Sequence, residues 1–244
     1  MPDPASLSPR QIQILKAVID EYIGTAEPVG SETLEKKYNL GVSPATIRNE
    51  IVRLTAMKFL NQSHTSAGRA PTPAALKYYV ENLMKTKDMS VADEVSVKEK
   101  MWDFRQEVDK LLREATKTLA EKTKTLAVTA TKDGDLYYSG AANILAMPEF
   151  YDYELTHQLL VTLDQFDFWW EVLGRHADPF YVILGEEFIP KGPLSQCSFI
   201  YHKFETPHIT GAIGVVGPSR LNYSTIIPVV RYVGDLIGEF TSNW

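Results

Sequence analysis

The chain has 244 residues, of which 44% are hydrophobic and 23% charged, and its formal net charge is −6. That length accommodates one large domain or two ordinary ones, and the near-average composition excludes disordered, collagen-like and disulfide-scaffold proteins. The single cysteine, Cys197, cannot form an intrachain disulfide, which favours a reducing, cytoplasmic location.

A helix is predicted close to the N-terminus. Ser8 is a typical helix cap, Pro9 suits the first helical position, and Gln11 stands where a capping box needs it. Gly24 is the expected end of this helix, after apolar residues at helical spacing: Ile12, Leu15, Ile19 and Tyr22. The residues before it lack the basic and apolar regions of a signal peptide, and no apolar run reaches the roughly 18–20 residues that cross a bilayer. We therefore expect neither a signal peptide nor a membrane span.

Two further helices follow at short intervals. Ser31 is expected to cap a short helix that ends near Tyr38, and residues 39–42 form a tight turn. Ser43 and Pro44 then cap and begin a third helix, which ends near Met57. A helix, a short helix, a four-residue turn and a helix in this order are the arrangement of a helix-turn-helix.

A wing is predicted next. Residues 59–62 form a short strand, residues 63–72 a polar loop, and Thr72 caps another amphipathic helix that ends near Met84. A loop that emerges from a two-stranded hairpin beside such helices is typical of a winged helix. The polar stretch 85–98 is interpreted as a linker.

The third helix carries the candidate DNA-reading residues. At 100° per residue, Ile47, Ile51 and Leu54 share one face and are expected in the core. The opposite face offers an amide for adenine, guanidinium groups for guanine or phosphate, and small apolar groups for a thymine methyl. Its candidate contact residues are Ala45, Thr46, Arg48, Asn49 and Arg53, together with Ser43 at the helix N-terminus, where a phosphate would sit. The alternative is an ordinary solvated helix face.

The wing loop supplies a second set of candidates: His64, Thr65, Ser66 and Arg69. Small neighbours allow its backbone to approach another backbone, and an arginine at the loop tip could enter a minor groove or bind phosphate. A solvent-exposed turn without DNA contacts is the alternative.

From Glu99 to about Lys122 the pattern is helical again, with apolar residues three and four apart. This helix either joins two subunits or packs on its own domain, and the sequence does not separate these alternatives. Beyond it, two strands flank residues 132–135 as a hairpin, further strands are predicted at 181–184, 197–201 and 211–216, and helices at 149–163, 168–175 and 226–240. Grouped strands with helices at the ends favour an α+β fold.

Charge divides the chain in the same way. Residues 1–87 hold eleven Lys and Arg against eight Asp and Glu, whereas the remainder holds 14 against 23. A mildly basic first third on an acidic remainder indicates two modules with different partners. We predict a DNA-binding domain at residues 1–88, a linker and amphipathic helix at 89–125, and an effector and dimerisation domain at 126–244.

Several segments resemble one known family. They are Pro28-Val29-Gly30-Ser31, residues 41–50 and 64–72, Gly140 to Leu145 with Pro148-Glu149-Phe150, residues 185–187, Leu194 with Cys197-Ser198, and residues 214–223. Together they are similar to the bacterial heat-inducible transcription repressor family, HrcA, over most of residues 7–87 and more loosely over 137–240.

The resemblance implies an N-terminal winged helix-turn-helix, a linker helix and a C-terminal GAF-like α/β domain. It also implies repression of heat-shock chaperone operons by a homodimer on an inverted-repeat (CIRCE-type) operator, with a chaperonin keeping the repressor active. Family members are longer and carry further GAF strands and an inserted dimerisation domain. Only residues 126–138 separate the linker helix from the Gly140 segment here, so we expect a shortened member with a truncated GAF-like domain.

No catalytic motif competes with this interpretation. The five histidines show no HExxH spacing, and Gly211, Gly214 and Gly217 lack the lysine and hydroxyl residue of a phosphate loop. His202, His208 and Cys197 form a weak alternative as metal ligands. We therefore expect no enzyme activity, cofactor or metal. The alternative function is a winged-helix regulator whose GAF-like domain senses a small molecule.

Overall fold

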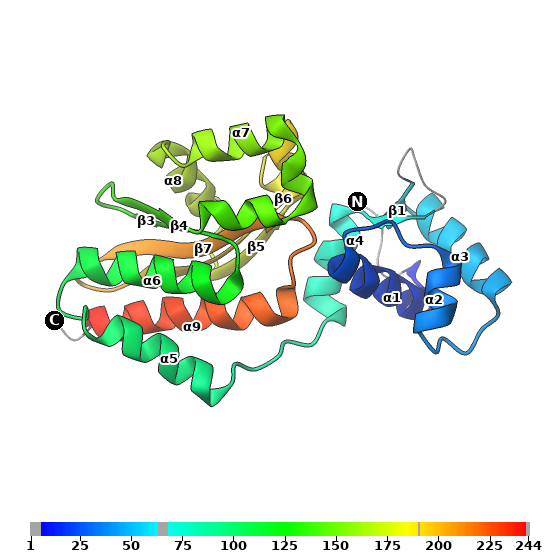
Figure 1. Ribbon diagram of the computed structural model, residues 1–244, viewed down its shortest axis with the longest axis horizontal. Helices are drawn as coiled ribbons and strands as arrows, with labels where there is room; N and C mark the ends of the chain where they lie inside the picture. Colours follow the sequence, from blue (N-terminus) through cyan, green and yellow to red (C-terminus); the bar gives the residue numbers. More distant parts are fainter. Residues whose placement is uncertain (1–5, 63–67, 190, 243–244) are drawn as a thin grey trace. The chain divides into compact units, whose positions relative to one another are not determined.

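The computed structural model describes residues 6–62, 68–189 and 191–242, and it divides into two compact units, Met1–Lys85 and Thr86–Trp244. We call them the N-terminal and the C-terminal unit (Figure 1). Each has its own buried apolar core. Among the described residues, no helix combines the length and the apolarity needed to cross a membrane.

The first three helices of the N-terminal unit are α1 (Pro9–Thr25), α2 (Ser31–Lys37) and α3 (Pro44–Ala56). The predicted capping box of α1 is confirmed, because Ser8 and Gln11 bond each other's backbone N–H groups. The predicted end at Gly24 is wrong. The helix continues to Thr25 and stops where Ala26 turns left-handed at φ 61°, with its N–H donated to the Tyr22 carbonyl. The predicted Ser31 cap is also wrong, since Gly30 occupies that position and Ser31 is the first helical residue.

The predicted hairpin is present as β1 (Leu60–Asn61) and β2 (Ala70–Pro71), which pair antiparallel. Thr72 caps α4 (Pro73–Tyr78) by accepting the N–H of Ala75. The helix then loosens into the π-helical turn η2 (Tyr79–Leu83), which the apolar spacing did not predict.

The C-terminal unit is built on one antiparallel sheet with strand order β4-β3-β7-β6-β5. Its strands are β3 (Leu126–Thr131), β4 (Leu136–Ser139), β5 (Phe180–Leu184), β6 (Cys197–Glu205) and β7 (Thr210–Pro218). The register aligns Val128 with Tyr138 on one side and with Gly214 on the other. The strands predicted for this part are all confirmed, and the hairpin at 132–135 joins β3 to β4.

Helices cover both faces of this sheet (Figure 1). α6 (Val108–Thr123) and α9 (Tyr223–Ser242) pack on one face, and α5 (Val91–Trp102) packs outside them. α7 (Tyr153–Thr162) and α8 (Phe166–Gly174) lie on the other face, where Trp169 and Phe199 belong to one buried cluster. Short 3-10 turns connect these layers: η3 (Ala141–Ala146), η4 (Pro148–Tyr151), η5 (Gly185–Glu187) and η6 (Pro193–Gln196). The predicted α+β class is confirmed.

The linker region differs from its prediction. Residues 91–98, expected as linker, are the first turns of α5, and the single helix expected over 99–122 is two helices broken at residues 103–107. Arg105 stabilises the end of α5, since its Nη1 donates to the Trp102 carbonyl at 2.7 Å and its guanidinium lies over the Trp102 ring. Met101, Leu111 and Ala115 are buried within their own unit, which supports packing on the same domain rather than a subunit contact for these side chains.

Candidate nucleic-acid interface

Helix α3 is anchored by one face and open on the other. Ser43 caps it, with Oγ accepting the N–H of Thr46 at 3.3 Å and lying 2.9 Å from the Thr46 hydroxyl. Ile47, Ile51 and Leu54 are buried, as the helical wheel predicted. The N-terminal backbone of α3 and its outer face are therefore presented on a rigid element.

The structure brings the helical candidates together on that outer face. Ser43, Ala45, Arg48, Asn49 and Arg53 are exposed, and Thr46 is half-buried. Val52, also exposed, adds an apolar group between them. Arginine and asparagine groups around small apolar ones match the hydrogen-bonding and methyl groups of a major groove.

Glu50 is a residue of this helix that sequence reasoning missed. Its side chain is only 8% exposed, yet Oε1 accepts a hydrogen bond from Nη1 of Arg53 at 2.9 Å. The other oxygen, Oε2, is buried and has no hydrogen-bond partner in the described part of the chain. The available signal was a glutamate three residues before an arginine on one helix, a spacing that brings side chains into contact.

Acidic residues of α1 fasten the surrounding helices. The Asp20 carboxylate accepts from Nζ of Lys16 at 2.5 Å and from the Tyr79 hydroxyl at 2.7 Å. The adjacent Glu21 accepts from Nζ of Lys37 at 2.5 Å. Burial, followed by the charges of Glu21 and Asp20, raises the pKa of Tyr38 to about 12, so this phenol stays a neutral donor to Glu21. These ties hold α2 and η2 to α1.

The root of the wing is tied to the turn before α2. Val29 and Arg69 exchange both backbone hydrogen bonds, at 2.8 and 2.9 Å. A Cβ at Gly68 would lie 2.5 Å from the Pro28 carbonyl oxygen, so only glycine allows this approach. Arg69 lies immediately before β2, at the root of the wing and not at its tip, and its Nη1 donates to the Gly68 carbonyl at 3.1 Å. His64, Thr65 and Ser66 lie outside the described residues.

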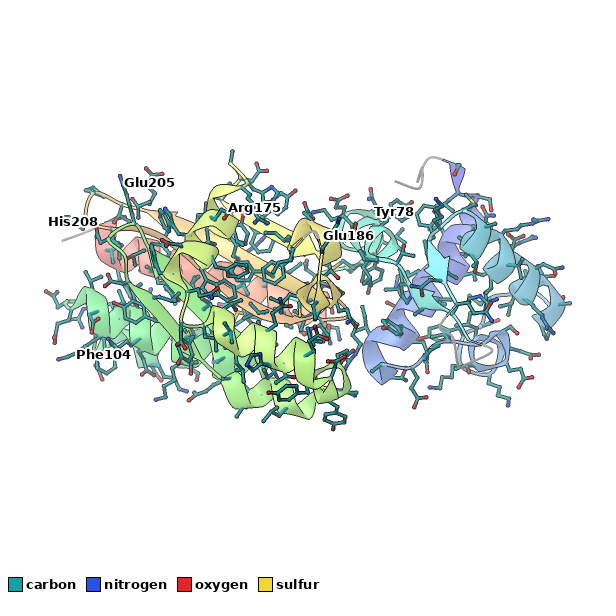
Figure 2. All side chains as sticks on the ribbon, turned by 90° about the horizontal axis from the view of Figure 1, so that it is seen from above. Tyr78, Phe104, Arg175, Glu186, Glu205 and His208 are labelled. Atoms are coloured by element: carbon teal, nitrogen blue, oxygen red, sulfur yellow. The ribbon has the colours of Figure 1, made fainter. Side chains whose placement is uncertain are left out.

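The three alternative metal ligands, His202, Cys197 and His208, lie in different settings. Nε2 of His202 lies 2.9 Å from the Asp235 carboxylate, and Cys197 is buried, with a pKa raised to about 12 by desolvation and then by the charge of Glu149. His208 lies near Glu205 at the turn between β6 and β7 (Figure 2). Within the described ranges, no three His, Cys, Asp or Glu side chains gather as a metal site.

Comparison with known proteins identifies the family. Residues 72–227 match the family model described as "HrcA protein C terminal domain", which is more than half of the chain. The chain belongs to the HrcA family.

Two HrcA relatives show how far the likeness extends. The heat-inducible transcription repressor HrcA of Clostridium acetobutylicum is 48% identical over 107 residues, which is 43% of this chain and 31% of that protein. The HrcA of Pelotomaculum thermopropionicum is 52% identical over 88 residues, 36% of this chain and 25% of that protein. The chain thus spans about a third or less of the length of these relatives.

A solved structure shares the fold. The crystal structure of a hypothetical protein at 2.2 Å resolution matches with a TM-score of 0.78 and 17% sequence identity, over 98% of this chain and 99% of that one. At this identity the likeness concerns the fold alone.

Proposed function

We propose that this HrcA-family chain is a DNA-binding transcriptional repressor of heat-shock chaperone operons. The observation that carries the proposal is α3, a capped and core-anchored helix of a helix-turn-helix whose exposed face carries Arg48, Asn49 and Arg53. Family membership supports it, since the relatives are named as heat-inducible transcription repressors. α3 enters the major groove, and the wing contacts the backbone or the minor groove through Arg69 and, outside the described residues, His64, Thr65 and Ser66.

The finer details belong to the same proposal. The chain acts in the cytoplasm as a homodimer on an inverted-repeat, CIRCE-type operator, because two-fold related reading helices match two-fold related half-sites. A chaperonin modulates its activity. No catalytic step is part of this function.

A mobility-shift titration tests the proposal. The full chain is titrated against an inverted-repeat duplex, a single half-site and a scrambled duplex of the same composition, with light scattering of each complex. We expect tighter binding to the inverted repeat, with two chains per duplex. Equal affinity for all three duplexes would contradict sequence reading, and one chain per inverted repeat would contradict the homodimer.

A further inference from the structure

Among the described residues, only one of the two carboxylate oxygens of Glu50 has a hydrogen-bond partner. The residue is 6% exposed, and burying a charge is costly unless both oxygens are paired. Oε1 is bonded to Arg53, whereas Oε2 has no hydrogen-bond partner among the residues that the structure describes. A neutral side chain would avoid this cost in folding free energy. The charge of Glu50 therefore indicates a role other than packing.

The geometry links that charge to the DNA-facing surface. On a helical wheel, Arg53 lies about 40° from Asn49 and about 60° from Glu50, between the outer face and the edge of the core. Its side chain is 66% exposed, whereas that of Glu50 is 8% exposed. The Glu50 carboxylate is therefore fixed by burial, and its hydrogen bond holds the exposed Arg53 guanidinium in place at the protein surface.

Such a contact changes what an arginine recognises. A guanidinium has five N–H donors, so one bond to Glu50 leaves enough donors for the two acceptors of a guanine edge. The fixed side chain also loses less conformational freedom when it binds. The negative charge beside it weakens its attraction to phosphate, which a free and fully charged arginine would bind in any sequence.

We propose that Glu50 is a positioning residue that makes Arg53 a reader of guanine instead of a phosphate-binding side chain. The inference rests on the proposed DNA-binding function and adds a specificity determinant to it. If the Glu50–Arg53 ion pair had only a structural role, its loss would weaken binding to all duplexes alike and would not change the preference for guanine.

The chain offers a matched control. Glu21 is likewise a buried carboxylate of the N-terminal unit, paired with the more exposed Lys37, but it lies on α1. Glu21→Gln therefore removes a comparable charge away from the reading face.

The test uses the full chain and duplexes that it selects from a random-sequence pool. Each base pair of the selected duplex is then replaced in turn by the other three. Binding is measured by fluorescence anisotropy at salt concentrations of about 50 to 200 mM. The proteins compared are the wild type, Glu50→Gln, Arg53→Ala, the double variant and Glu21→Gln. We expect Glu50→Gln to lose about tenfold preference for guanine at one position of each half-site. It should bind scrambled duplex at least as tightly as the wild type, and the slope of log affinity against log salt should steepen by about 0.9 per chain. Arg53→Ala should lose the same preference, the double variant should match Arg53→Ala, and Glu21→Gln should keep the wild-type profile.

Other outcomes overturn the proposal. A wild-type base profile in Glu50→Gln or in Arg53→Ala, or a uniform loss on every duplex, would exclude a positioning role. Should Glu50→Gln melt below the assay temperature, Arg53→Lys decides, because lysine keeps the charge but cannot bind guanine with two parallel donors. Retained guanine preference in that variant rejects the proposal. A wild type without any sequence preference would instead refute the proposed function, and this inference with it.

Discussion

Asn49 and Arg69 occupy different settings in the N-terminal unit, and they should contribute differently to DNA binding. Asn49 is exposed on α3, whereas the Arg69 backbone is fixed against Val29 at the wing root. Asn49→Ala should cost about 1–3 kcal/mol of binding to the selected operator and relax its sequence preference, because the amide can pair with adenine through two hydrogen bonds. The affinities of operator and scrambled duplexes, measured side by side, check this.

Arg69→Ala is the comparison variant for that measurement. Its loss should be nearly the same on operator and scrambled DNA, because contacts to phosphate carry no sequence information. Equal losses on both duplexes for Asn49→Ala as well would contradict the assignment of α3 to the major groove.

The residues of α3 show what sequence reasoning could reach at this scale. The helical wheel separated Ile47 and Leu54 in the core from Arg48 and Asn49 on the surface, because a helix buries one side by its period alone. It could not place Glu50, which lies at the boundary of the two faces, where packing decides between burial and exposure. The position of Arg69 at the wing root depended on pairing with Val29, 40 residues earlier, and no local pattern contains such a contact.

At the scale of elements, the segments of the C-terminal unit that resemble HrcA form contacts that connect separate parts of its fold. Gly140 adopts φ 79°, and a Cβ there would lie 2.4 Å from the Thr125 carbonyl oxygen. Asn143 donates to that same carbonyl at 2.9 Å and so fastens η3 to the start of β3. The Pro148-Glu149-Phe150 and Gly214–Tyr223 segments meet in an ion pair, since Nε of Arg220 lies 2.5 Å and Nη2 lies 3.0 Å from the two oxygens of Glu149.

Breaking this ion pair should loosen the C-terminal unit. The side chains of Arg220 and Glu149 are only 16% and 19% exposed, so Glu149→Gln leaves a poorly solvated guanidinium without its carboxylate. We expect a loss of about 1–3 kcal/mol in the free energy of unfolding, measured with urea. Glu107→Gln breaks the exposed pair with Lys110 and should change that free energy by less than about 0.5 kcal/mol. Similar losses in both variants would refute a special role for the Glu149 pair.

The wing root allows a second prediction for an element. Gly68→Ala places a methyl group against the Pro28 backbone, which cannot yield without moving the turn before α2. We expect a loss of about 1–3 kcal/mol in the stability of the N-terminal unit, visible as a lower thermal midpoint by circular dichroism. Gly24→Ala is the control, because Gly24 is helical and exposed, and a methyl group added there would meet nothing within 4 Å. That variant should gain about 0.5–1 kcal/mol, since alanine favours helix. A stable Gly68→Ala protein would show that the turn is not constrained.

The limits of sequence prediction also differ by element. Helices with strong caps, such as α1 and α3, were placed almost to the residue at their N-termini. The break between α5 and α6 was missed because residues 103–107 contain neither glycine nor proline, and the contact of Arg105 with Trp102 found there is not encoded in the apolar spacing. The strands of the C-terminal unit were found, but their order in the sheet follows from long-range pairing, which periodicity does not encode.

At the scale of the whole molecule, the net charge of −6 has little meaning as an average. A mildly basic N-terminal third carries the candidate DNA interface, and the acidic remainder contains the sheet and its helices. Nucleic-acid binding therefore depends on a local surface and not on the isoelectric point of the chain. The C-terminal unit instead has a titratable contact between its sheet and α9.

That contact should make stability fall in mild acid. Nε2 of His202 on β6 lies 2.9 Å from the carboxylate of Asp235 on α9. Burial lowers the pKa of His202; the charge of Asp235 acts against this shift, and the charge of Arg231 adds to it. Because the folded pKa lies below the unfolded value of about 6.5, the unfolded chain binds more protons in this window. The stabilising contribution of neutral His202 is complete above about pH 6.5 and is lost as the pH falls through the folded pKa, with a slope of at most about 1.4 kcal/mol per pH unit.

His202→Gln should remove this part of the pH dependence. Urea unfolding of the wild type and the variant between pH 8 and pH 5 measures it, with His208→Gln at the exposed turn between β6 and β7 as the matched control. The wild type and His208→Gln should lose stability in parallel below about pH 6.5, whereas His202→Gln should follow a flatter curve. A proton on His202 would also strengthen its attraction to Asp235. Burial, which disfavours the protonated form, and this attraction, which favours it, therefore act in opposite directions. A stability that rises toward pH 5 only when His202 is present would show that the ion pair with Asp235 outweighs burial.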